Sequence, residues 1–324
     1  MSSGVDFDLP FPHRCSPDLE TARLHNLTWL RSHGLLEGAA DEDRFQEMAL
    51  AEVSAYAYPE ARGADLDVVT DAVTWIAIAD DLLDRLDVHD EGALRQATAF
   101  TQACVDLVEG TPLGLRKPVE QMPLLGALAD LLGRLADGMS TQWQRRFAQG
   151  LREWLWSSLD MSYFRPHGAY LSLHMYRILC RETNGNRFFF PLTERAGGFE
   201  VPTALLAHPL IGAVHQAADE MVAFVQAVHS ARVEESRGDH HNLVLVLQHE
   251  RRCSRQEAIT AALHEIAAAR DLFIGLTADL PAVYDSLGLT VSERASAERY
   301  INGVRDIVAA ARDYGPESSR YTGV

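Results

Sequence analysis

The chain has 324 residues and a formal net charge of -17, and 47% of its residues are hydrophobic. This balance is typical of a folded globular protein, and the length allows one large domain or two small ones. The negative charge argues against nucleic acid and anionic membrane surfaces as partners, because both would repel the protein. A phosphorylated ligand would need cations gathered locally.

The sequence contains no apolar stretch long enough to cross a membrane, and its first residues lack a basic region followed by an apolar core. We therefore expect no membrane span and a cytoplasmic location. The four cysteines, Cys15, Cys104, Cys180 and Cys253, include no Cys-x-x-Cys pair. This scatter predicts reduced thiols, with neither a disulfide framework nor a zinc site.

The predicted elements are helical throughout. Residues 1–17 begin the chain as an extended arm, because the prolines at 10, 12 and 17 prevent a helix. Helical periodicity between glycine and proline breaks then predicts helices over residues 18–33, 41–56, 65–86, 91–109, 122–139, 141–163, 169–183, 202–210, 212–235, 254–276, 281–287 and 292–314. Since strand patterns, linkers and repeats are missing from the sequence, the expectation is one all-α domain, residues 1–324, built as a helical bundle.

The first candidate site lies at the end of the predicted helix 65–86, which is apolar on every face and therefore expected to be buried. That helix ends in Asp80-Asp81-Leu82-Leu83-Asp84. Asp80 and Asp84 are four residues apart, so their carboxylates share one helix face and need a cation between them. Hard oxygen ligands favour Mg²⁺. The alternative is an acidic turn that faces water, with Arg85 as its counter-charge.

A second group of oxygen-bearing side chains follows on the predicted helix 212–235. Gln226, Ser230 and Glu234 are spaced four residues apart and form one stripe. An amide oxygen, a hydroxyl and a carboxylate in a row can chelate a hard metal, although the alternative is an ordinary polar helix face. The adjacent pair His240 and His241 would diverge by about 100°, which favours a surface turn over a pair of metal ligands.

The order and spacing of these residues resemble bacterial class I terpene synthases, also called terpene cyclases, over nearly the whole chain. The resemblance rests on the Pro10-Phe11 arm, Trp29, Trp75 ahead of Asp80-Asp81-x-x-Asp84, a stripe similar to the family motif Asn-Asp-x-x-Ser-x-x-x-Glu, Gly238-Asp239-x-x-Asn242-x-Val244, and the terminal pair Arg320-Tyr321.

The resemblance implies a single helical bundle around a central cavity that both motifs face. It implies that three Mg²⁺ ions hold the diphosphate of a linear isoprenyl substrate, whose departure leaves an allylic carbocation that cyclises to a terpene hydrocarbon or alcohol. The implied metal ligands are Asp80, Asp84, Gln226, Ser230 and Glu234. Such ions and nearby cations stabilise a departing diphosphate, and an apolar, partly aromatic wall protects the carbocation from water.

The resemblance also assigns the end of the chain. Arg320 and Tyr321 are expected to contact the diphosphate as catalytic residues. Residues 315–324 are rich in glycine, proline and serine, so we expect them to be a mobile lid that becomes ordered when metal and diphosphate bind.

The chain departs from the family pattern at several positions. Gln226-Ala227 replaces Asn-Asp, and Val233 replaces the basic residue that usually precedes the final Glu. The family's diphosphate-sensing arginine aligns best with Cys180, which leaves Arg181 and Arg177 as rival candidates. Of these two, Arg181 is nearer and is assigned a catalytic role.

The expected cavity wall differs as well. Ile76 and Ala77 stand where the family often has aromatic residues, and Tyr314 stands where a tryptophan is common. One of the three aromatics in Phe188-Phe189-Phe190 should face the cavity, and Phe188 is assigned to the wall. Three tryptophans are expected in the core or shielding the surface: Trp143, Trp154 and Trp156.

Several functions remain open at this stage. Farnesyl diphosphate is the favoured substrate, and geranylgeranyl diphosphate is the rival because Ala77 is small. A chain-elongating prenyltransferase would need a second Asp-Asp-x-x-Asp, for which Asp219-Glu220 is a poor substitute. A binding protein of this fold with a degraded metal motif is the third possibility. Many helical enzymes are homodimers, but neither oligomeric state nor product skeleton can be read from the sequence.

Overall fold

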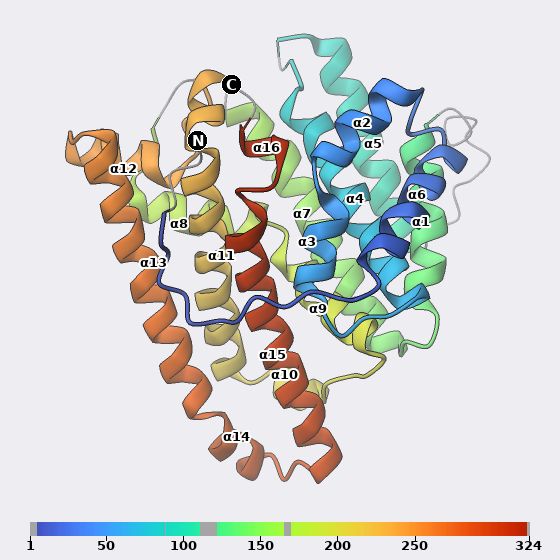
Figure 1. The fold of residues 1–324 in the computed structure, drawn as a ribbon, viewed down its shortest axis with the longest axis vertical. Helices are drawn as coiled ribbons and strands as arrows, with labels where there is room; N and C mark the ends of the chain where they lie inside the picture. The colour runs from blue at the N-terminus through green and yellow to red at the C-terminus, as the bar shows by residue number, and fades with distance from the viewer. Residues whose placement is uncertain (1–4, 88, 111–121, 165–169, 323–324) are drawn as a thin grey trace.

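The computed structural model describes residues 5–87, 89–110, 122–164 and 170–322, and these ranges contain helices and no strand (Figure 1). The helices are α1 Leu19–Ser32, α2 Ala39–Glu47, α3 Leu50–Ala57, α4 Ala64–Asp84, α5 Glu91–Val108, α6 Pro123–Ala136, α7 Thr141–Phe164, α8 Leu173–Thr183, α9 Asn186–Gly197, α10 Thr203–Leu206, α11 Pro209–Ser236, α12 Leu243–Arg251, α13 Arg255–Ala278, α14 Leu280–Ser286, α15 Val291–Tyr314 and α16 Ser319–Thr322. The predicted all-α bundle is confirmed. Over the described ranges, every helix is too short or too polar to cross a bilayer.

The helix boundaries differ from the predictions in a few places. The expected helix 41–56 is broken at Ala49, whose φ of 55° places it in the left-handed region, so α2 and α3 are separate. The segment 202–210 is the short α10 and the start of α11. Three helices were missed. They are α9, which contains Pro191, the short α16 near the end of the chain, and α12, which Asn242 begins by accepting hydrogen bonds from the amides of Val244 and Leu245.

Helix α4 lies in the core of the bundle, as its apolar faces predict. It packs against α1, α3, α6, α7 and α9. Leu66, Val69 and Ala79 are completely buried, and Trp75 donates its indole N–H to the carbonyl of Leu124 at 2.7 Å. Burial on all sides fixes the direction of the helix, and its C-terminal end carries the Asp80-Asp81-x-x-Asp84 motif.

Helix α11 is the other long element that positions the site. It lies between α13 and α15 in Figure 1 and also contacts α8 and α12. Pro209 occupies its first turn, where a missing N–H costs nothing, and the His208 ring accepts a hydrogen bond from the Leu210 amide. The C-terminal half of α11 carries the stripe of Gln226, Ser230 and Glu234.

The chain bends sharply between α8 and α9, where Gly185 adopts a φ of 79°. Inside α9, Pro191 lacks the N–H that would pair with the carbonyl of Arg187. Gly150 of α7 approaches that carbonyl so closely that a Cβ at this position would lie 2.7 Å from the oxygen. Trp143 of α7 donates a hydrogen bond to the Pro191 carbonyl at 2.9 Å. These contacts hold α9 against α7.

The described part of the N-terminal arm, residues 5–17, runs without helical structure across α13, α11 and α15 (Figure 1). Phe7 packs on the ring of His229 with centroids 5.1 Å apart, and Phe11 packs edge-on against Phe273 at 5.8 Å. Arg312 donates to the carbonyls of Leu9 and Phe11, each at 2.9 Å. The predicted extended arm is confirmed for these residues; residues 1–4 lie outside the described ranges.

A buried polar network joins α1, α4 and α6. The fully buried carboxylate of Asp71 accepts hydrogen bonds from His25 at 2.9 Å, Asn26 at 2.7 Å and Arg134 at 2.9 Å. The hydrogen bond to Asp71 raises the pKa of His25; burial and Arg134 oppose the rise, and the Asp67 carboxylate supports it. Protonated His25 therefore stabilises the fold.

We expect His25→Gln to destabilise the protein more at about pH 5.5 than at about pH 8.5. A raised folded-state pKa gives stability that is complete below the ordinary histidine pKa of about 6.5 and is lost as pH rises through the folded-state value. Urea unfolding of both proteins at the two pH values measures this difference. Equal differences in unfolding free energy at both would show that the charge on His25 contributes nothing.

Candidate active site

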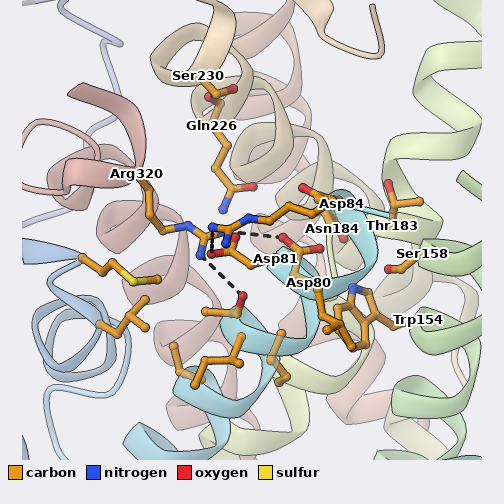
Figure 2. Close-up of a pocket in the computed structure, with 18 of the residues that line it drawn as sticks. Asp80, Asp81, Asp84, Trp154, Ser158, Thr183, Asn184, Gln226, Ser230 and Arg320 are labelled. Carbon is orange, nitrogen blue, oxygen red and sulfur yellow. Dashed lines mark hydrogen bonds and ion pairs between the residues drawn. The ribbon is translucent and has the colours of Figure 1, made fainter. Parts of the chain in front are cut away.

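A cavity of about 2050 Å³ lies between the C-terminal halves of α4 and α11, and residues of α16 line part of it. All five predicted metal ligands line this cavity: Asp80, Asp84, Gln226, Ser230 and Glu234. Figure 2 shows the aspartates of α4 on one side and Gln226 with Ser230 on the other. The first motif therefore faces a cavity shared with the second motif, which lies far from it in the sequence.

Arg320 of α16 lies across the acidic motif. Its Nη2 is 3.0 Å from Asp81 Oδ1 and 3.4 Å from Asp80 Oδ2, and Nη1 donates to the carbonyl of Ala77 at 3.5 Å (Figure 2). Burial lowers the pKa of Arg320, but the carboxylates of Asp81 and Asp80 more than offset this, so the pKa stands above its ordinary value. A positive charge therefore sits beside the carboxylates, where the sequence predicted a cation.

The second motif is positioned by a buried asparagine. Ser230 donates to the Gln226 carbonyl at 2.9 Å and accepts a hydrogen bond from Asn242 Nδ2 at 3.3 Å. Asn242 is fully buried and also donates to the Ala227 carbonyl at 2.7 Å, while its Oδ1 accepts from the amide of Val244 at 2.8 Å. Asn242 thus ties the start of α12 to the face of α11 that carries Ser230.

The two adjacent histidines in the turn between α11 and α12 point to different surroundings. His241 lines the cavity, and its Nδ1 is 3.3 Å from Asp239 Oδ1. The ring of His240 instead stacks on Tyr170, whose other face stacks on His249, with centroids 4.2 Å and 3.9 Å away. The two rings therefore diverge, as adjacent positions predict, and His241 faces the cavity where a surface turn was expected.

The donor set fits a hard divalent cation. Across the described ranges, no group of three His, Cys, Asp or Glu side chains is gathered closely enough to hold an ion alone. The five predicted ligands on the two walls offer oxygen donors, from carboxylates, an amide and a hydroxyl. Such a site suits an ion whose remaining ligands are water and the oxygens of a phosphorylated substrate, as is common for Mg²⁺.

The structure does not place either candidate diphosphate-sensing arginine on the cavity wall. Arg177 pairs with Glu265 and lies 3.6 Å from Glu220. Arg181 donates its Nε–H to the carbonyl of Arg177 at 2.7 Å. Cys180 does line the cavity, and burial raises the pKa of its thiol to about 12. The roles predicted for Arg177 and Arg181 are therefore corrected. This turn of α8 directs the neutral Cys180 toward the cavity and both arginine side chains toward protein partners outside it.

Other basic residues do line the cavity. Arg44 pairs with Asp41 and Arg85 with Asp81, at 3.0 Å and 3.4 Å. Arg237 lines the cavity at the end of α11. It follows Val233 by four residues, so it lies on the same helix face one turn further along.

The hydrophobic wall is partly as predicted. Ile76, Ala77 and Tyr314 line the cavity. Phe188 does not: it is completely buried and packs edge-on against Trp154 at 5.5 Å, so its assignment to the wall is wrong. Phe189 lines the cavity instead, because successive side chains on α9 are turned by about 100°.

Sequence reasoning missed several cavity residues. Trp154 was expected in the core, and it is buried but also lines the cavity. The missed residues on α5, α7 and around the α8–α9 break include Phe100, Trp154, Ser158, Tyr176, Thr183, Asn184 and Asn186. The amphipathic pattern of α7 could have indicated that Trp154 faces the cavity. The cavity residues around the α8–α9 break could be identified only from the fold.

The predicted lid segment is folded over the cavity in its described part, residues 315–322. Tyr314 and Ser318 both donate to the carbonyl of Met48, at 2.7 Å and 2.9 Å. Tyr321 stacks on His229 with centroids 6.0 Å apart. Gly315 also touches His229, since a Cβ there would lie 2.2 Å from the imidazole. Ordering of this segment by ligand stays a prediction; residues 323–324 lie outside the described ranges.

This geometry defines a class of enzyme: a helical bundle in which two oxygen-rich motifs and an arginine surround one end of a largely hydrophobic cavity, as ionisation of an isoprenyl diphosphate requires. Comparison with known proteins agrees. Residues 71–271 match the family described as "Terpene synthase family 2, C-terminal metal binding". The chain is 33% identical to pentalenene synthase of Streptomyces avermitilis, over 99% of this chain and 94% of that one. The chain belongs to the bacterial class I terpene synthases.

A solved structure shows the same architecture. Linalool/nerolidol synthase from Streptomyces clavuligerus, in complex with 2-fluorogeranyl diphosphate, superposes with a TM-score of 0.85 at 30% identity, covering 98% of this chain and 100% of that one. The all-α single-domain fold is thereby confirmed. As a terpene synthase, the protein is a lyase that acts on an isoprenyl diphosphate with a divalent metal cofactor.

Proposed function

We propose that the protein is a magnesium-dependent sesquiterpene synthase that ionises farnesyl diphosphate with three Mg²⁺ ions and cyclises the resulting carbocation. The observation that carries this proposal is the position of the two oxygen-rich motifs on opposite walls of one cavity. Among relatives, 7-epi-alpha-eudesmol synthase of Streptomyces viridochromogenes, 29% identical over 99% of this chain and 93% of that one, is named as "(2E,6E)-farnesyl diphosphate cyclizing".

Asp80 and Asp84 on one wall and Gln226, Ser230 and Glu234 on the other would hold the metal ions. When bound, the ions supply positive charge that stabilises the departing diphosphate. Gln226 is one methylene longer than asparagine, so its amide oxygen lies further from the axis of α11. The position of Ser230, the next ligand along this helix, then matters more, and Asn242 holds Ser230 in place.

The remaining charge around the diphosphate comes from the protein itself. Arg320 and Tyr321 of α16 line the cavity and can donate hydrogen bonds to phosphate oxygens. Arg237 would supply the positive charge that Val233 lacks, because it lies one turn away on the same face. Arg320 would exchange its contacts with Asp80 and Asp81 for contacts with the diphosphate.

The rest of the cavity suits the hydrocarbon chain. Its wall contains Ile76, Ala77, Phe100, Trp154 and Phe189. These side chains exclude water, and the faces of the aromatic rings stabilise a nearby positive charge.

The function is tested by incubating the purified protein with Mg²⁺ and, separately, geranyl, farnesyl and geranylgeranyl diphosphate, followed by analysis of the volatile products. Farnesyl diphosphate should give the highest kcat/KM and fifteen-carbon products. Binding of a diphosphate without turnover would identify a binding protein with a degraded metal motif.

Three further expectations from the sequence stay predictions: a homodimer, a cytoplasmic location and the lack of nucleic-acid partners.

Geranylgeranyl diphosphate is the second candidate substrate, because the cavity is large and Ala77 leaves room in its wall. We expect Ala77→Phe to lower use of the longer substrate about tenfold more than use of farnesyl diphosphate. Overpacking a fitted site costs about 1 to 3 kcal/mol, and about 1.4 kcal/mol corresponds to a factor of ten in rate.

The measurement is a competition assay with both diphosphates on wild type and Ala77→Phe. Ala103→Phe on α5 serves as a control, because Ala103 does not line the cavity. An unchanged product ratio in Ala77→Phe would mean that residue 77 does not gauge chain length.

A further inference from the structure

Two buried hydroxyl groups, those of Tyr314 and Ser318, join the end of α15 to the break between α2 and α3. Because α2 ends at Glu47 and the chain turns at Ala49, the Met48 carbonyl belongs to neither helix and can accept hydrogen bonds from elsewhere. Tyr314 donates to this carbonyl at 2.7 Å and Ser318 at 2.9 Å, and the two hydroxyl oxygens are 2.9 Å apart. The three oxygens form one closed hydrogen-bonded group, the hydroxyl cluster.

The hydroxyl cluster is shielded from water. Ser318 is completely buried, and Tyr314 is 5% exposed. Burial raises the pKa of Tyr314, against the opposing effects of Arg320 and of the hydrogen bond with Ser318, so the phenol stays protonated and can donate. Since water does not reach these groups easily, a hydrogen bond lost here is not readily replaced by one to solvent.

Ser318 also connects the hydroxyl cluster to the lid. It directly precedes α16, and its Oγ accepts a hydrogen bond from the backbone amide of Arg320 at 3.2 Å, as the side chain of an N-cap residue does. A hydroxyl can donate one hydrogen bond and accept others, so a single atom links the Met48 carbonyl to the Arg320 backbone. From there the guanidinium extends to Asp81 and Asp80, 3.0 Å and 3.4 Å away (Figure 2).

This arrangement fixes the backbone at Arg320 and leaves the side chain able to move. In the proposed function the guanidinium exchanges Asp80 and Asp81 for the diphosphate, and the amide can stay bound to Ser318 during that exchange. Anchoring the backbone reduces the conformational freedom that the side chain must lose when it contacts the diphosphate.

One other side-chain hydrogen bond joins α3 to this part of the chain. Tyr56 donates to Glu317 at 2.8 Å, in an exposed position where water competes for both groups. The buried hydroxyl cluster is therefore the stronger anchor of the two.

We propose that Tyr314 and Ser318 are positioning residues, which fasten the Arg320 backbone to the Met48 carbonyl so that the guanidinium meets the substrate diphosphate in one defined orientation. This inference rests on the proposed function. It assigns the hydroxyl of Tyr314 a role separate from that of its ring, which lines the cavity.

The test is a double-mutant cycle between the hydroxyl cluster and Arg320, with the full-length enzyme, Mg²⁺ and farnesyl diphosphate. The double variant Tyr314→Phe/Ser318→Ala removes both hydroxyls and keeps the aromatic ring in the wall. Its kcat/KM should fall about tenfold, which corresponds to about 1.4 kcal/mol. With Arg320→Gln already present, the same two changes should cost no more than about twofold, because no guanidinium is left to position. A merely structural role would give the same factor in both backgrounds.

Ser54→Ala is the matched control. Ser54 is also completely buried and donates to a backbone carbonyl, that of Leu50 at 2.8 Å, but it does not line the cavity. Its kcat/KM should equal that of wild type.

Isothermal titration calorimetry with inorganic diphosphate and Mg²⁺ gives a second measurement that needs no turnover. The double variant should bind diphosphate about tenfold more weakly than wild type, and the two changes should have little effect when Arg320→Gln is present. Tyr314→Phe alone should show a smaller loss of the same kind, and it remains informative if the double variant does not fold.

Wild-type kcat/KM and diphosphate affinity in the double variant overturn the inference and leave the proposed function intact. Equal losses with and without Arg320→Gln do the same. If the wild type turns over no isoprenyl diphosphate, the proposed function itself fails, and the calorimetric cycle then decides whether the hydroxyl cluster positions Arg320.

Discussion

Replacing Asp80 by asparagine should lower kcat/KM for the isoprenyl diphosphate by about 100-fold or more, the loss typical when one charge-stabilising group is removed from an active site. The substitution deletes a charged metal ligand and keeps the side-chain volume. Asp80 is partly exposed at the end of α4, outside the packed core, so the melting temperature should hardly change. Steady-state kinetics across a range of Mg²⁺ concentrations, with thermal unfolding alongside, measure both quantities.

Asp84→Asn should give a similar loss, because both carboxylates face the cavity. Asp137→Asn is a control on an exposed residue after α6 and should behave as wild type. Near-wild-type turnover of Asp80→Asn at saturating Mg²⁺ would show that the carboxylate is not a metal ligand.

Replacing Arg320 by glutamine should affect two affinities in opposite directions. Inorganic diphosphate with Mg²⁺ should bind about 10- to 100-fold more weakly, because a hydrogen bond to a charged group contributes about 1.5 to 3 kcal/mol. Mg²⁺ alone should bind more tightly, because the guanidinium that lies 3.0 Å from Asp81 and 3.4 Å from Asp80 no longer competes for the carboxylates.

Isothermal titration calorimetry with Mg²⁺ alone, and then with diphosphate at fixed Mg²⁺, separates these effects. Arg85→Gln is the matched control: Arg85 also pairs with Asp81, but its side chain is 70% exposed, and such pairs contribute little. If Arg320→Gln also weakens binding of Mg²⁺ alone, Arg320 organises the carboxylates and does not compete with the metal.

The sequence predicted those parts of the site that depend on helical spacing alone. Asp80 and Asp84 share one face of α4, as do Gln226, Ser230 and Glu234 on α11, and an i, i+4 pattern is enough to show this. The apolar faces of α4 likewise predicted its burial. These inferences required no knowledge of how the helices pack.

The errors came from contacts between distant segments. Arg177 pairs with Glu265 on α13, a partner that no local pattern reveals. Phe188 was assigned to the cavity wall, and Phe189 lies there instead. The start of α9 sets the direction of each ring, and a helix containing Pro191 was not expected.

The close approach of α7 to α9 has a consequence for the evolution of new products. Any side chain at Gly150 would collide with the Arg187 carbonyl, so α9 would have to shift. Phe189 and Asn186, which line the cavity, would move with it. Gly150 does not line the cavity, yet it is a position at which a single nucleotide change, in nature or in a directed-evolution library, could redirect the cyclisation without altering any residue that touches the substrate.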